Sequence, residues 1–245
     1  MLVILISFLL LIFIIYYYSI RLNTPPVIFL SSYQIEKLLN DEFYNYYNTM
    51  SDDNLLLRRI TNNTKGVQTY LKNINKHFYD CNYIEKKILK EAIKKANKKI
   101  NLIQSPGFYP TKLKKIPWII GCSYGYDYEF GMPHTKNNII ILNNSNIYDN
   151  DLVTTLIHER IHIYQKMFPE DIEEYIKYHN FKRISKKTDT DRVNPDTDEF
   201  IYKKNNTIYE CKIDTSSSNC KIICTKNDSK YEHPFEYMAY TLSEL

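Results

Sequence analysis

Residues 152–167 read LVTTLIHERIHIYQKM and give the clearest structural signal in this chain. The preceding residues, Asp149, Asn150 and Asp151, supply helix caps and place negative charge beside the positive end of a helix dipole. Pro169 follows the stretch and stops a helix, because proline has no backbone N–H to donate. The pattern therefore predicts a helix from about Leu152 to Met167, and the apolar residues on its other face predict that it is packed against a core.

Two histidines project from one face of this predicted helix. His158 and His162 are four residues apart, so their imidazoles can reach a single ion, and Glu159 stands beside them. Neutral imidazole is a good zinc ligand, and a neighbouring carboxylate can take a proton from zinc-activated water. A His-Glu-x-x-His pattern arises by chance in about one such chain in a hundred. The context favours a Zn2+ site, with Glu159 as its base.

Thr155–Tyr164 resembles the active-site helix of the zincin metallopeptidases. The resemblance implies that His158 and His162 bind zinc and that Glu159 activates water for peptide-bond hydrolysis. Arg160 stands where those helices usually carry an uncharged residue. The glycine and third histidine of the metzincin subclass are absent, since Gln165 and Phe168 occupy those positions.

The segment 233–240, HPFEYMAY, resembles the ligand helix of the gluzincins, which carries a glutamate ligand followed by Ala and Asp three and four residues later. The resemblance implies Glu236 as the third metal ligand. Tyr240 replaces the Asp that orients a histidine ligand in those families, so either its hydroxyl or another carboxylate takes that role. Three other residues compete for the ligand position: His233, Glu232 and His179.

The resemblance also implies a cleft beside the metal. An edge strand before the metal helix pairs with extended substrate in zincins, and residues 138–142 stand in the right order for it. His134 is a candidate for the same cleft, although a structural role is favoured. The donors to a developing oxyanion are chosen by chain position only: Tyr231, His233, Tyr240 and Arg192. Residues 192–198 form a turn rather than a calcium loop, because they lack an EF-hand's glycine and final glutamate.

Residues 1–20 contain no charged side chain, and a nearly continuous aliphatic run is followed by three tyrosines and Arg21. About twenty apolar residues can span a bilayer as a helix, and the tyrosines suit its interface. A cleaved signal peptide is the alternative, but a basic start and a small-residue cleavage site are missing. We therefore expect a single-pass membrane anchor, with the side of the membrane left open.

The expected fold class is α+β. A transmembrane helix at 1–20 and a linker at 21–31 precede a helical subdomain at 32–115 and a zincin-like catalytic subdomain at 116–245. Short strands are expected at 118–120, 124–130 and 138–142, a further helix at 170–178, a hairpin from 208–213 and 221–225, and a last helix at 235–242.

The charge and cysteine content exclude some functions. The net charge of +4 is small, and the lysine-rich stretch 86–99 lacks interleaved aromatic residues, so nucleic-acid binding is not expected. Five cysteines leave at least one unpaired, and no Cys-x-x-Cys pair indicates a thiolate zinc knuckle. Cys211 can pair with Cys220 or with Cys224.

The sequence thus predicts a membrane-anchored zinc metallopeptidase acting on a peptide or protein substrate. The alternative is a zincin-like, membrane-tethered binding or structural module without peptidase activity. A third hypothesis is a membrane-anchored helical scaffold in which the motif is accidental, and it predicts neither metal nor a cleft near His158.

Overall fold

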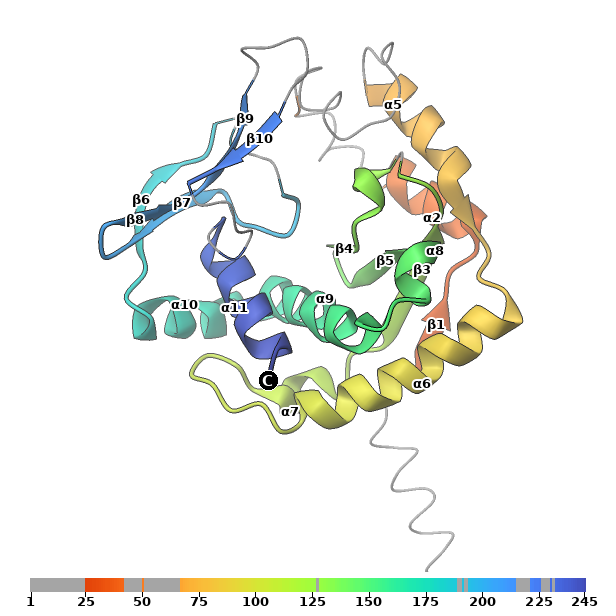
Figure 1. Ribbon diagram of the computed structural model, residues 1–245, viewed down its shortest axis with the longest axis horizontal. Coiled ribbons are helices and arrows are strands. Elements are labelled where there is room, and N and C mark those ends of the chain that lie inside the picture. Colours follow the sequence, from red (N-terminus) through yellow and green to blue (C-terminus); the bar gives the residue numbers. More distant parts are fainter. Residues whose placement is uncertain are drawn as a thin grey trace, which may run out of the picture.

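The structure is a computed structural model of a mixed α and β protein with several sheets (Figure 1). It describes residues 25–41, 50, 67–126, 128–188, 191, 194–214, 221–225, 230 and 232–245. Within these ranges, no helix combines the length and apolar character needed to cross a membrane. The predicted anchor at 1–20 lies outside them.

The main sheet has five strands, in the order β1-β3-β5-β4, with β2 pairing β3 off this path. Their bounds are β1 Val27–Phe29, β2 Phe78–Tyr79, β3 Trp118–Ser123, β4 His134–Lys136 and β5 Ile139–Asn143. β1, β3 and β5 run parallel, whereas β2 and β4 are antiparallel to their partners. Within the range 21–31 of the predicted linker, Val27–Phe29 forms strand β1 of this sheet.

β5, the strand before the predicted metal-binding helix at 152–167, is central, which corrects the expectation of an edge strand at 138–142. β5 pairs with β3 on one side and β4 on the other, and all five of its residues are buried. Ile140 and Leu142 belong to one hydrophobic core, whereas Ile139 and Ile141 belong to the other. A continuous apolar run is typical of a strand covered on both faces. The outer strand of the described sheet at this end is β4.

Helices cover both faces of the sheet. α2 Ser32–Asp41 and α5 Val67–Ile74 contribute to the smaller core, and α6 Tyr83–Ile100 and α9 Leu152–Met167 to the larger one. A 3-10 turn at Asn75–His77 and strand β2 separate α5 from α6, which interrupts the predicted helical run. The larger core joins residues on both sides of position 116, so the two predicted subdomains share it.

The predicted strand at 124–130 is wrong. Gly125 turns the chain, and Glu129, Phe130 and Gly131 form a 3-10 turn in which all three φ angles are positive, at 47°, 57° and 69°. Positive φ is incompatible with an extended strand. Two short helices, α7 Pro110–Leu113 and α8 Asn144–Ile147, complete the part of the chain before α9.

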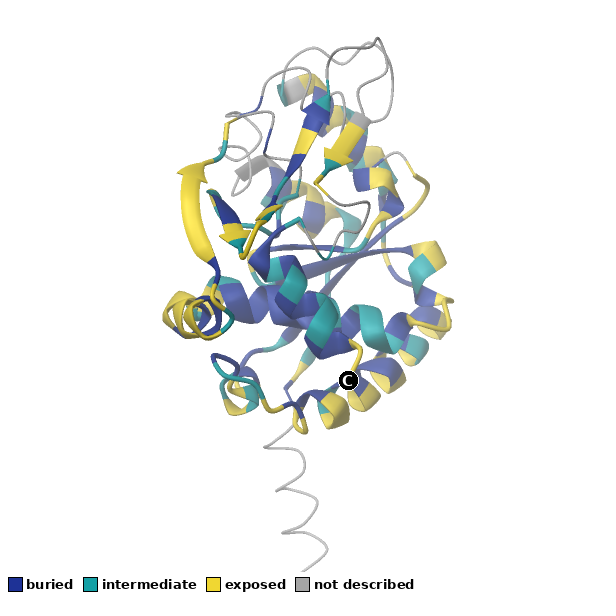
Figure 2. Ribbon diagram, turned by 60° about the vertical axis from the view of Figure 1, so that its left-hand side comes forward, coloured by how far each residue is buried: buried dark blue, intermediate teal, exposed yellow. Residues whose placement is uncertain are grey.

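The chain after α9 forms a layer on the side of α9 that faces away from the main sheet. There, α10 Pro169–Tyr178 leads into a small antiparallel sheet (Figures 1 and 2). Its strands are β6 Lys182–Lys186, β7 Phe200–Lys204 and β8 Thr207–Tyr209. β9 Cys211–Asp214 and β10 Lys221–Cys224 form the predicted hairpin, and α11 Pro234–Ser243 ends the chain. Residue 210 divides the predicted strand 208–213 into β8 and β9.

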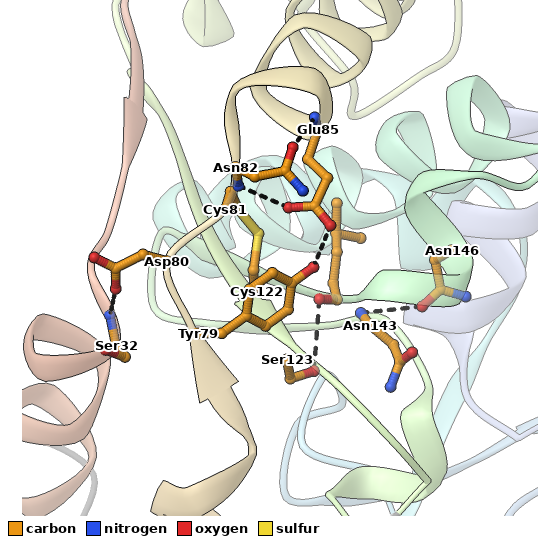
Figure 3. Close-up of a disulfide and its surroundings, with 11 residues drawn as sticks. Ser32, Tyr79, Asp80, Cys81, Asn82, Glu85, Cys122, Ser123, Asn143 and Asn146 are labelled. Carbon is orange, nitrogen blue, oxygen red and sulfur yellow. Dashed lines mark hydrogen bonds between the residues drawn. A yellow bond between two sulfur atoms is a disulfide. The ribbon is translucent and has the colours of Figure 1, made fainter.

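Two disulfides link elements of the described chain, Cys81 with Cys122 and Cys211 with Cys224. The first joins the start of α6 to β3 (Figure 3). Beside it, Glu85 and Asn82 form a capping box on α6, and the Tyr79 hydroxyl donates to Glu85 at 2.8 Å. The second disulfide selects one of the two predicted partners of Cys211.

Candidate metal centre

Two helices present the predicted metal ligands to each other. α9 begins and ends at the predicted residues, Leu152 and Met167, and it packs against α11. His233 caps α11 by accepting a hydrogen bond from the backbone N–H of Phe235 at 3.1 Å. Glu236 then falls in the first turn of α11, facing the two histidines of α9.

His158, His162 and Glu236 form a compact group of three potential ligands. The two histidine Nε2 atoms lie 2.9 Å apart, and Glu236 oxygens lie 3.4 Å from His158 Nε2 and 3.2 Å from His162 Nε2. Tetrahedral zinc with bonds of about 2.0–2.1 Å places neighbouring ligand atoms about 3.3 Å apart. The separations are of this size, although the two Glu236 contacts use different oxygens, Oε2 toward His158 and Oε1 toward His162. One ligand atom of each residue lies within 4.8 Å of the others, which is close enough for the group to bind one metal ion.

The group lines a cavity of about 240 Å³. Glu159 lines it too, is 3% exposed, and has one carboxylate oxygen without a hydrogen-bond partner among the described residues. Burial, reinforced by the Asp196 carboxylate, raises the pKa of Glu159 to about 8. A carboxylate that is not committed to another contact can exchange a proton with a molecule in the cavity.

Two side-chain amides contact the ligand group, that of buried Gln165 and that of partly buried Asn194. The Gln165 Oε1 atom lies 2.8 Å from His162 Nδ1, and Gln165 Nε2 donates to the Phe235 carbonyl at 2.9 Å. Asn194 Nδ2 donates to Glu236 at 2.8 Å and also to Glu232 at 3.2 Å. The sequence reasoning missed both amides. The spacing of three residues from His162 could have indicated Gln165, whereas Asn194 carries no local signal.

Two of the predicted cleft residues line the cavity. Tyr240 packs its ring edge-on against His158, with centroids 4.5 Å apart. His134 is engaged at both ring nitrogens, by the Tyr128 hydroxyl at 2.8 Å and the Met132 carbonyl at 3.0 Å. His134 therefore lines the cavity with both of its ring nitrogens already engaged by protein groups.

The three competing ligands lie outside the compact group. Both ring nitrogens of His233 are occupied, since Nε2 lies 2.9 Å from Asp198. Glu232 lines the cavity, and burial raises its pKa to about 7. His179 packs among tyrosines at the end of α10. The other predicted oxyanion donors, Tyr231 and Arg192, lie outside the described residues.

Arg160 points away from the metal group and is 1% exposed. Its guanidinium donates to the backbone carbonyls of Leu113, Ile116 and Pro117 at 2.5–3.2 Å and lies 4.5 Å over the Trp118 ring. The unusual residue within the motif therefore ties α9 to the chain that leads into β3.

No protein-family model matches the chain, and neither a curated protein nor a solved structure shows significant similarity to it.

Proposed function

We propose that this protein is a zinc-dependent metallopeptidase in which His158, His162 and Glu236 hold the metal. The observation that carries the proposal is the grouping of these three side chains from two helices, with one ligand atom of each within 4.8 Å of the others. A zinc ion there supplies Lewis-acid activation of water and of a substrate carbonyl.

Glu159 performs the proton transfers in this proposal. Its carboxylate accepts a proton from the water that attacks the carbonyl carbon, and it delivers that proton to the amine nitrogen as the carbon–nitrogen bond breaks. The position of Glu159 supports this role, because it is buried at the wall of the cavity that the metal group lines. A structural zinc site has no use for a base at that position.

The test is a Glu159→Gln variant, which keeps the shape of the side chain and removes the base. We expect it to bind zinc normally and to cleave an unfolded protein substrate at least ~100-fold more slowly than wild type. Cleavage at the wild-type rate by zinc-loaded Glu159→Gln would remove Glu159 from this role.

We further propose that residues 1–20 anchor the enzyme in a membrane and that the catalytic part faces an oxidising compartment. The apolar run supports the anchor. The two disulfides support the oxidising side, since disulfides persist in secretory, periplasmic or surface environments. Extraction of the full chain by detergent but not by alkaline carbonate is the expected result. Release by carbonate contradicts the anchor.

The second candidate function, a binding module without peptidase activity, retains one specific support. The backbone of Thr135 on the outer strand β4 is already bonded to Asp196 and Lys166, where a peptidase would pair its substrate. Zinc bound at one per chain, with no cleavage of any peptide in a diverse peptide mixture, would favour that module.

A further inference from the structure

Gln165 is a buried amide whose two ends have different partners. It is 2% exposed, on the turn of α9 after His162. Its Nε2 atom lies 2.9 Å from the Phe235 carbonyl oxygen, and its Oε1 atom lies 2.8 Å from His162 Nδ1. Because water has little access to this amide, losing either hydrogen bond would leave a buried polar group unsatisfied and destabilise the folded protein.

The Phe235 carbonyl fixes which way the amide points. A carbonyl oxygen only accepts hydrogen bonds, so the NH2 group of Gln165 must face it. The Gln165 oxygen then faces His162 Nδ1, and that nitrogen must carry a proton in order to donate. In the neutral imidazole, His162 Nε2 is thereby left with its lone pair toward His158 and Glu236.

The same amide connects the two ligand-bearing helices. Gln165 and His162 belong to α9, whereas Phe235 immediately precedes Glu236 in the first turn of α11. Any sliding of α11 along α9 breaks the bond from Gln165 to Phe235. The relative position of the histidine and glutamate ligands is thus tied to one side chain.

We propose that Gln165 is the positioning residue of the metal site, fixing the tautomer and ring orientation of His162 and the register of Glu236. The inference rests on the proposed function. Tyr240, the aromatic side chain beside the ligand group, contacts the ring of the other histidine, His158. Gln165 therefore supplies, on α9 itself, an outer partner for His162.

Two substitutions of Gln165 separate positioning from simple packing. Gln165→Met keeps the volume and removes both hydrogen bonds. Gln165→Glu keeps an acceptor for His162 Nδ1, and in its neutral form it also donates to the Phe235 carbonyl. Outer partners of metal-bound histidines contribute ~10–100-fold to metal affinity. Gln165→Met should therefore lower the zinc affinity by that factor, whereas Gln165→Glu should bind zinc about as tightly as wild type.

Asn97→Leu is the matched control. The Asn97 side chain also accepts a hydrogen bond from a ring N–H, that of Trp118 at 3.2 Å, but it lies on α6 and contacts none of the three ligands. The full chain in detergent micelles is titrated with zinc against a chromophoric chelator, and folding is checked by circular dichroism. Asn97→Leu should leave the zinc dissociation constant unchanged.

Three results overturn the inference. Gln165→Met that binds zinc as tightly as wild type shows that Gln165 does not position the site. If Gln165→Met and Asn97→Leu weaken zinc binding equally, the effect reflects a general loss of stability. Wild-type protein that binds no zinc contradicts the proposed function as well, whereas the first two results leave that function standing.

Discussion

The Nζ atom of Lys166 lies 2.6 Å from Oδ1 of Asp196, and this ion pair closes the outer side of strand β4. The Thr135 N–H donates to both Asp196 oxygens at 3.2–3.3 Å, and the Thr135 carbonyl accepts from Lys166 at 3.0 Å. A strand edge offers such groups to an incoming peptide. In the proposed peptidase, pairing of a substrate with Thr135 would require this ion pair to move aside.

The ion pair also stabilises the fold, and a double-mutant cycle measures it. Asp196→Ala leaves Lys166 and the Thr135 N–H without their carboxylate, so we expect a loss of about 2 kcal/mol in the free energy of unfolding. The value is below that for fully buried pairs, because Lys166 can still reach water. Lys166→Met in the Asp196→Ala background should cost less than it does alone. Additive losses in urea unfolding would contradict the coupling.

Arg160 should matter for stability and not for metal binding. Arg160→Met retains apolar contact with Trp118 but leaves three carbonyls without their donor. We expect the free energy of unfolding to fall by about 3 kcal/mol. The zinc dissociation constant of the folded protein should stay at the wild-type value, as measured by chelator competition. A large loss of zinc affinity in a folded variant would place Arg160 in the metal site instead.

Local sequence patterns predicted α9 and the grouping of His158, His162 and Glu236, whereas non-local strand pairing was predicted poorly. Helical spacing and Pro169 gave the bounds of α9, because those signals are local, whereas the predicted cap residue Asp151 makes no side-chain hydrogen bond to the helix. The central place of β5 depends on its parallel pairing with β3, which is not its neighbour in the chain, although its unbroken apolar run was a usable signal. Asn194 reaches Glu236 across 42 residues, and no periodicity encodes such a contact.

Protonation of His233 should lower the free energy of unfolding as the pH falls. Burial lowers the pKa of His233 to about 4, against the opposing effect of Asp198, whereas an unfolded histidine titrates near 6.5. The unfolded state therefore binds the extra proton between those values. This contribution is fully present above pH 6.5 and is lost as pH falls toward 4, by at most ~1.4 kcal/mol per pH unit.

A His233→Asn variant tests this pH dependence, because Asn can still cap α11 but does not titrate. Its free energy of unfolding, measured in urea at several pH values from 7 to 4, should show a shallower decline than wild type. Identical slopes in the two proteins would assign the acid sensitivity to other groups.

The Cys81–Cys122 disulfide should be a main source of stability. It spans 41 residues and joins the start of α6 to β3. Loop-closure entropy gives about 4 kcal/mol for a cross-link of that length. The double substitution Cys81→Ala and Cys122→Ala should therefore lower the free energy of unfolding by several kcal/mol while the ligand helices stay paired. An unchanged unfolding midpoint would show that the cross-link constrains little.

The zinc content of the purified full chain, measured by elemental analysis, tests the central claim most directly. We predict about one zinc per chain in the wild type, and loss of that zinc in both His158→Ala and Glu236→Ala, which remove ligands from different helices. Folded wild-type protein without metal would contradict the metallopeptidase proposal. Zinc retained in Glu236→Ala would contradict the assignment of Glu236 as the third ligand.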